Sequence, residues 1–166
     1  VGAPNAGKSS LLAAISRARP KIAEYPFTTL SPALGVVEYQ RESFVAVDIP
    51  GLIEGAHAGA GLGDEFLRHI QRTRVLVHMV DGSADDPISD YLGILEEMRL
   101  FDNGLAAKPR IVAINKVDLG SVRSSADRLK QEFEANGATP RFISAVTREG
   151  LDELLGDVLQ QLAQES

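Results

Sequence analysis

Hydrophobic residues along the chain follow two patterns, one typical of strands and one typical of helices. Runs rich in β-branched residues predict strands, and the last three runs are nearly continuous, as in buried parallel strands. The residues that join the first two runs are polar, which favours a hairpin. The predicted strands are residues 35–39, 43–48, 75–81, 110–115 and 141–143.

Segments with apolar residues at helical spacing separate these runs. They predict helices over residues 8–17, 64–73, 88–101, 124–135 and 151–163. Strands that alternate with helices are typical of an α/β fold, here with a mostly parallel sheet that carries helices on both faces. Residues 19–32 and 51–63 fit neither pattern, and loops of this length are often functional.

Composition narrows the classes of protein to consider. The 166 residues are 44% hydrophobic and 24% charged, which is typical of one globular domain. The chain has no cysteine, which excludes disulfides and Cys-ligated metal sites. A net charge of -6 argues against direct binding of naked nucleic acid. No apolar run approaches the roughly 20 residues of a membrane helix, and we expect a monomer without a membrane contact.

A glycine-rich segment near the start has the pattern of a phosphate-binding loop, Gly-x-x-x-x-Gly-Lys-Ser. Backbone N–H groups of such a loop surround a phosphate, and the helix that follows presents its positive end. Lys8 adds a positive charge for the outer phosphates, and the hydroxyl of Ser9 can bind Mg²⁺. The residues expected to bind nucleotide here are Gly2, Ala3, Pro4, Asn5, Ala6, Gly7, Lys8, Ser9 and Ser10.

A phosphate-binding loop should follow a strand, yet only Val1 precedes this one. In P-loop folds that strand is central to the sheet, so its absence would leave a gap in the core. We therefore expect residues 1–166 to be a single GTP-binding domain from a longer, multidomain protein. We also expect this chain by itself to fold poorly.

A second motif, Asn-Lys-Val-Asp at residues 115–118, predicts selectivity for guanine. The Asp118 carboxylate can accept hydrogen bonds from guanine N1–H and N2–H₂, groups that adenine does not offer. Asn115 can contact the other edge of the base and the phosphate loop, while the Lys116 stem can cover one face of the purine. A loop after the last strand can direct a backbone N–H to guanine O6. The expected base-side residues are Asn115, Lys116, Val117, Asp118, Ser144, Ala145 and Val146.

The segment Asp-Ile-Pro-Gly at residues 48–51 ends a predicted strand, where ligands bind in open α/β sheets. Asp48 can hold Mg²⁺ through water, and the Gly51 N–H can contact the γ-phosphate; a plain turn is the alternative. Residues 51–63 can switch between order and disorder with that phosphate. The expected residues are Asp48, Ile49, Pro50 and Gly51, with Phe27, Thr28, Thr29, Leu30 and Ser31 in the other loop, where a hydroxyl can complete the metal shell.

The order of these elements resembles a Ras-like P-loop GTPase domain and, more narrowly, the Obg family. The resemblance covers essentially the whole chain, with GAPNAGKSS at 2–10, YPFTTL at 25–30 and DIPGLIEGA at 48–56. It implies a cytoplasmic GTPase with roles in large ribosomal subunit maturation and stringent-response signalling, with guanosine tetraphosphate as a further ligand. It also favours Thr29 over Thr28, so that Ser9, Thr29 and Asp48 are the expected Mg²⁺ ligands.

One position departs from the Ras-like pattern, in which a glutamine after the Asp-x-x-Gly glycine orients the attacking water. Leu52 occupies it and cannot form a hydrogen bond, so we predict slow intrinsic hydrolysis. GTPases that resemble this one often use an asparagine at the place of Asn5 to hold K⁺; alternatively, Asn5 only bonds within its loop. The expected catalytic residues are Lys8, Thr29, Gly51 and Asn5.

Three functions are compatible with these motifs. The first is a Mg²⁺-dependent GTPase that works as a conformational switch. The second is a nucleotide-gated binding module whose output is partner binding, with partner-assisted hydrolysis as a reset. The third, a P-loop kinase, is disfavoured because the sequence has no evident acceptor pocket or arginine-rich lid.

Overall fold

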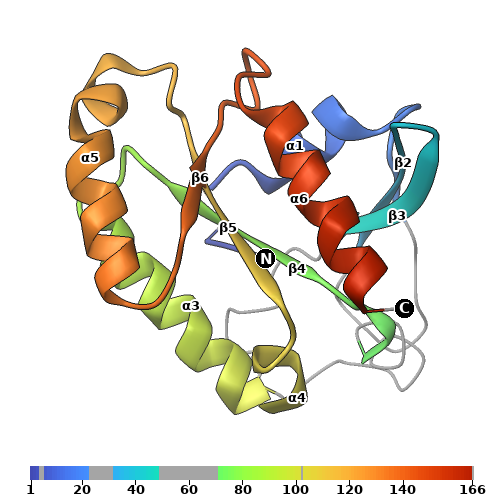
Figure 1. The fold of residues 1–166 in the computed structure, drawn as a ribbon, viewed down its shortest axis with the longest axis horizontal. Helices are drawn as coiled ribbons and strands as arrows, with labels where there is room; N and C mark the ends of the chain where they lie inside the picture. The colour runs from blue at the N-terminus through green and yellow to red at the C-terminus, as the bar shows by residue number, and fades with distance from the viewer. Residues whose placement is uncertain (4–5, 23–31, 49–70, 102, 166) are drawn as a thin grey trace.

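The computed structural model describes residues 1–3, 6–22, 32–48, 71–101 and 103–165 of the chain. Within these ranges it contains two three-stranded sheets, with helices packed around the second (Figure 1). The first sheet is antiparallel, in the order β1 (Lys21–Ile22), β2 (Ala33–Tyr39) and β3 (Glu42–Asp48). The second is parallel, in the order β4 (Leu76–Asp81), β5 (Arg110–Asn115) and β6 (Pro140–Phe142).

Helices cover both faces of the parallel sheet, because its strands are apolar on both sides. Val112 and Ile114 of β5 pack against Phe133 and other buried residues of the helices on one face. Ile111 and Ala113, which alternate with them, pack against the helices on the opposite face. Figure 1 shows α3 (Pro87–Phe101) and α5 (Gly120–Ala135) on one side of β5, and α1 (Lys8–Ile15) and α6 (Leu151–Gln164) on the other. The expected α/β fold is confirmed.

Several elements lie where the hydrophobic pattern places them. Strand β5 has the predicted bounds, and β2, β3, β4, β6, α3 and α6 differ from the prediction by one or two residues at an end. The hairpin between β2 and β3 is confirmed, with Tyr39 paired to Glu42. Its turn consists of Gln40 and Arg41, both with positive φ (51° and 67°), as in a tight turn that matches the twist of two strands.

Other elements differ because tertiary contacts decide them. Helix α1 ends at Ile15 rather than at residue 17, since Ser16 is extended and forms a bridge with Val37 of β2. Helix α5 begins at Gly120, four residues before the predicted start at 124. The short elements β1 and α4 (Asn103–Ala106) were not predicted. Of the helix predicted over 64–73, residues 64–70 lie outside the described residues, and 71 and 72 are helical.

The N-terminal residues lie beside β4 and run parallel to it. The Val1 carbonyl accepts a hydrogen bond from Met79 N at 2.8 Å, and the Val1 amine donates to the Val77 carbonyl at 2.8 Å. A cavity of about 330 Å³ with apolar side chains such as Leu11 and Phe44 in its wall lies between β3 and β4. We still predict that a strand before the phosphate loop belongs there. It also remains a prediction that residues 1–166 are one domain of a longer protein and fold poorly alone.

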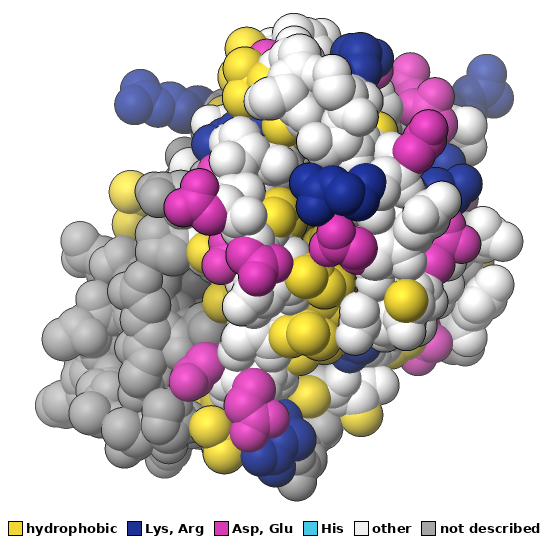
Figure 2. Space-filling view, turned by 90° about the vertical axis from the view of Figure 1, so that its left-hand side faces the viewer, with side chains coloured by type: hydrophobic (Ala, Val, Ile, Leu, Met, Phe, Trp, Pro, Cys, Tyr) yellow, Lys and Arg dark blue, Asp and Glu magenta, His cyan; other side chains and the backbone are white. Residues whose placement is uncertain are grey.

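The helical face over α3 and α5 carries charges of both signs. In the part of this face that Figure 2 colours, Lys and Arg side chains stand next to Asp and Glu side chains. Exposed pairs such as Arg128 with Glu132, 3.0 Å apart, contribute little to stability individually. Within the described ranges, no helix has the length and apolar character needed to cross a lipid bilayer.

Candidate functional site

The phosphate-binding loop leads directly into helix α1, which begins at Lys8. Gly7 precedes it in the left-handed region, with φ of 96°. A Cβ at this position would overlap Asn115 Nδ2, so the site requires glycine for both conformation and space. No side chain caps this end of α1, which leaves backbone N–H groups of its first turn available to a phosphate.

Lys8 lies folded back over the phosphate-binding loop. Its Nζ donates a hydrogen bond to the Gly2 carbonyl at 2.8 Å, and within the loop Ala6 N donates to the Ala3 carbonyl at 3.0 Å. This hydrogen bond to a backbone carbonyl holds the Lys8 ammonium group at the loop. This position suits the role expected from the sequence, a point charge for the outer phosphates.

Ser9 and Asp48, two of the three expected Mg²⁺ ligands, lie in contact. Ser9 Oγ donates a hydrogen bond to Asp48 Oδ2 at 3.1 Å, and the Asp48 side chain is buried at the end of β3. In the part of the chain that the structure describes, the other oxygen, Oδ1, is buried without a hydrogen-bond partner. An unsatisfied carboxylate oxygen beside a hydroxyl fits Mg²⁺, which in phosphate sites takes one or two protein ligands and completes its shell with phosphate and water.

Several predicted site residues lie outside the described residues, and their placement stays a prediction. They include the third expected metal ligand, the expected potassium ligand and the expected γ-phosphate contact. They are Pro4, Asn5, Phe27, Thr28, Thr29, Leu30, Ser31, Ile49, Pro50, Gly51 and Leu52.

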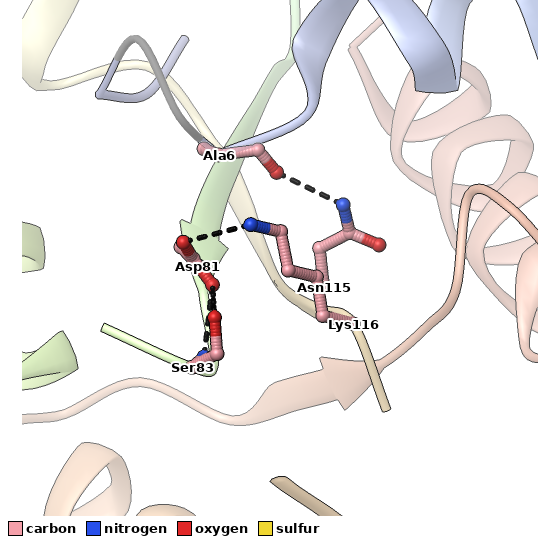
Figure 3. Close-up of polar contacts among 5 residues, drawn as sticks. All are labelled: Ala6, Asp81, Ser83, Asn115 and Lys116. Carbon is pink, nitrogen blue, oxygen red and sulfur yellow. Dashed lines mark hydrogen bonds and ion pairs between the residues drawn. The ribbon is translucent and has the colours of Figure 1, made fainter. Parts of the chain in front are cut away.

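Asn115 connects the phosphate loop with the base-side loops, and Figure 3 shows its contact with Ala6 of the phosphate loop. Its Nδ2 donates to the Ala6 carbonyl at 2.9 Å, and its Oδ1 accepts a hydrogen bond from Ala145 N at 3.0 Å. The side chain is 4% exposed, so both hydrogen bonds are shielded from water. Ala6 and Ala145, which lie 109 and 30 positions from Asn115 along the chain, therefore both bind its side-chain amide.

The rest of the Asn-Lys-Val-Asp motif forms a tight turn after β5. Lys116 has φ of 74°, which is unusual for a residue other than glycine. Val117 N donates to the Ile143 carbonyl at 3.1 Å, which joins this turn to the end of β6. Asp118 is exposed, so its carboxylate is accessible to a ligand.

The loop that starts at Ser144 is held by the protein itself. Ser144 N donates to the Glu149 carbonyl at 2.9 Å, and Ser144 Oγ accepts a hydrogen bond from Thr147 N at 3.0 Å. Ala145 N is bound to Asn115. The two N–H groups that the sequence offers to guanine O6 are therefore engaged within the protein, whereas Val146 is 81% exposed.

Sequence reasoning missed Asp81 and Ser83, which lie beside the predicted base-side residues. Asp81 Oδ2 lies 2.9 Å from Lys116 Nζ, and Ser83 donates two hydrogen bonds to Asp81 Oδ1. The signal was present in the sequence, because Asp81 ends a predicted parallel strand, as Asn115 does. The two residues are register partners at the same edge of the sheet.

Comparisons with known proteins agree with this geometry. Residues 1–116 match the family described as 50S ribosome-binding GTPase. The GTPase Obg of Caldanaerobacter subterraneus subsp. tengcongensis is 55% identical over 166 residues, which cover 98% of this chain and 39% of that protein. The GTPase Obg of Synechococcus sp. strain JA-2-3B'a(2-13) is 53% identical over 167 residues, which cover 100% of this chain and 48% of that protein. The chain thus spans less than half the length of these relatives.

Solved structures share the fold at lower sequence identity. The G domain of the T. maritima FeoB iron transporter has a TM-score of 0.67 at 22% identity, over 98% of this chain and 95% of that chain. Era in complex with MgGDPNP and nucleotides 1506–1542 of 16S ribosomal RNA also has a TM-score of 0.67 at 22% identity, over 96% of this chain and 54% of that chain.

These matches confirm the P-loop GTPase fold and the resemblance to Obg. The family match spans well over half of the chain, and the relatives align along nearly all of it. The chain belongs to the 50S ribosome-binding GTPase family, and along nearly its whole length it is similar to the GTPase Obg proteins.

Proposed function

We propose that this chain binds GTP and GDP with Mg²⁺ and hydrolyses GTP slowly, as a switch between two conformations. The observation that carries the proposal is the bridge from Ala6 through Asn115 to Ala145. It joins the Gly-x-x-x-x-Gly-Lys-Ser segment to the Asn-Lys-Val-Asp segment and to the loop after β6, which supports one binding site across these three segments. Family membership supports the same activity.

The chain's own residues supply most of the binding chemistry in this proposal. The N–H groups at the start of α1 and the Lys8 ammonium hold the phosphates, while the Asp118 carboxylate selects the base. Ser9 and Asp48 would hold Mg²⁺, which neutralises charge on the phosphates when it is bound. We propose that the Thr29 hydroxyl completes the Mg²⁺ shell and that the Gly51 N–H contacts the γ-phosphate.

Base selectivity gives the direct test of nucleotide binding. Asp118→Asn should weaken GDP binding about ten- to a hundredfold, because a bidentate charged hydrogen bond is lost. The same variant should gain affinity for xanthosine diphosphate, whose C2 oxygen can accept a hydrogen bond from the new amide. Asp127→Asn, an equal change at an exposed position of α5, is the control. Unchanged preference for GDP in Asp118→Asn would contradict the assignment.

Turnover tests the catalytic part of the proposal. We propose that K⁺ bound at Asn5 stands in for an arginine finger, since Leu52 cannot orient the attacking water. GTP hydrolysis should then be faster in potassium than in sodium buffer, and Asn5→Ala should remove the difference. Equal and very slow rates in both buffers would contradict the role of K⁺ and indicate that Asn5 bonds only within its loop.

The biological setting is also a proposal. The family description supports the large ribosomal subunit as a partner. We also propose a cytoplasmic role in subunit assembly and stress signalling, which the resemblance to Obg implies. Guanosine tetraphosphate, which carries the same base as GDP, is a proposed further ligand. Co-sedimentation with 50S subunits in a non-hydrolysable GTP analogue, compared with GDP, tests the partner.

The alternative function is a nucleotide-gated binding module, and Leu52 is the observation that favours it. In that case partner binding depends on the nucleotide, while turnover stays slow until a partner is present. If 50S subunits stimulate GTP turnover, hydrolysis is assisted by a partner, as the binding module requires. If they have no effect, the chain hydrolyses GTP without help. Transfer of the γ-phosphate to a small acceptor rather than to water would instead indicate a kinase.

A further inference from the structure

Asp81, at the carboxyl end of β4, is held from two sides (Figure 3). Its Oδ2 accepts a hydrogen bond from Lys116 Nζ at 2.9 Å. Its Oδ1 accepts hydrogen bonds from Ser83 N at 2.8 Å and from Ser83 Oγ at 2.6 Å. The Asp81 side chain is 13% exposed and the Lys116 side chain 34% exposed, so the pair is partly shielded from solvent.

The charge state of this carboxyl group follows from its neighbours. Burial by itself would raise the pKa of Asp81, but hydrogen bonds from Ser83 and Lys116 outweigh burial and lower the pKa below its ordinary value. Asp81 is therefore ionised at neutral pH. An ionised carboxylate with three donors is a fixed anchor for the lysine that it faces.

Lys116 is also constrained through its backbone. Its φ of 74° is rare for a residue with a side chain. The turn is held by Leu119 N, which donates to the Lys116 carbonyl at 3.0 Å, and by the bond from Val117 N to the Ile143 carbonyl. The turn fixes where the side chain of Lys116 begins, and Asp81 fixes where it ends. The aliphatic stem between these two points is left with few rotamers.

We propose that Asp81, oriented by Ser83, is a positioning residue for guanine-nucleotide binding that holds the Lys116 stem as a preformed wall for the purine. It acts through Lys116 and does not contact the nucleotide. The inference rests on the proposed function, because the purine is the ligand that this stem would cover. A lysine that is already tethered loses less side-chain freedom on binding than a free one.

A purely structural ion pair is the competing explanation. The ends of β4 and β5 are also joined by a hydrogen bond from Gly82 N to the Asn115 carbonyl at 3.1 Å. This backbone contact does not involve either charged side chain. Removal of the Asp81 charge therefore leaves the strand ends joined, and the effect of the ion pair on binding can be measured separately.

The test is a double-mutant cycle in a protein that carries residues 1–166 together with the strand that we expect before the phosphate loop, with the GDP dissociation constant measured by calorimetry. Asp81→Asn should raise this constant about three- to tenfold, the range expected when one long side chain must be immobilised on binding. In a Lys116→Met background, the same change should raise it less than twofold, because the residue through which Asp81 acts is gone.

Two further variants sharpen the result. Asp157→Asn is the matched control, since it removes the charge from an ion pair with Arg141, 2.6 Å apart, on the surface of α6. It should leave GDP binding unchanged. Ser83→Ala keeps both charges but removes one hydrogen bond to Asp81, and it should raise the dissociation constant in the same direction by about twofold.

Each outcome decides the proposal. An unchanged constant in Asp81→Asn, or an equal increase in the native and Lys116→Met backgrounds, overturns the positioning role while the proposed function stands. If Asp81→Asn unfolds, Ser83→Ala decides, and unchanged binding in that variant overturns the role. Failure of the native protein to bind GDP, when its circular dichroism and cooperative urea unfolding show that it is folded, would overturn the proposed function and this inference together.

Discussion

Replacement of Asn115 by alanine should damage folding and nucleotide binding at once. Asn115 is 4% exposed, and its side chain joins the Ala6 carbonyl to Ala145 N. Alanine leaves one acceptor and one donor without these partners in a buried place. Each unsatisfied group of this kind lowers stability by about 1–3 kcal/mol. If water reaches one of them, the free energy of unfolding should still fall by about 1–3 kcal/mol.

The assay is urea unfolding of the ligand-free chain, followed by calorimetric titration with GDP under conditions where the variant is folded. GDP binding should weaken beyond what partial unfolding explains, because the phosphate loop and the base-side loop lose their fixed separation. Asn136→Ala is the control, since Asn136 donates to the Glu132 carbonyl at 2.9 Å in an exposed position at the end of α5. A loss in Asn115→Ala no greater than in the control would refute the reasoning.

Two further predictions concern backbone conformation and pH. In urea unfolding, Gly7→Ala should lower the free energy of unfolding by at least about 1–2 kcal/mol, because Gly7 has a φ of 96° and a Cβ there would overlap Asn115. The control Gly93→Ala, in open space on α3, should leave this free energy unchanged or raise it. Burial, then the Val1 amine and Arg110, lower the pKa of His78 well below 6.5, so the folded state keeps it neutral while the unfolded chain binds a proton. Stability should therefore fall by about 1.4 kcal/mol for each pH unit below about 6.5. His78→Leu should reduce that slope, and an equal slope in both proteins would contradict the burial argument.

The parts of the fold that the sequence predicted are those in which local pattern and burial agree. Strand β5 is apolar on both faces and is buried from Ile111 to Asn115, so a continuous hydrophobic run was sufficient to define it. Helix α6 buries Leu151, Leu154, Leu155 and Val158 along one stripe, and its amphipathic pattern located it. The nucleotide motifs were located in the same way, because glycines and strand ends occur at fixed spacings.

The elements that were missed depend on partners distant in sequence. Nothing local ends α1 at Ile15; the bridge from Ser16 to Val37 does so. Strand β1 consists of only Lys21 and Ile22, and it exists because Leu34 and Ala33 lie opposite. Asp81 also looked like an ordinary strand end until the register of β4 against β5 placed it beside Asn115. Single-residue patterns do not carry this pairing information.

Contacts within the protein hold the residues that we expect to bind the nucleotide. Asn115 joins two loops, Ser9 contacts Asp48, and Lys116 is tied to Asp81. Each contact starts from a residue at the end of a strand or the start of a helix whose neighbours are packed in the core. Packing of β5 therefore sets the separation between the phosphate loop and the base-side loops. A core substitution that shifts β5 should weaken GDP binding even when every residue that contacts the nucleotide is intact.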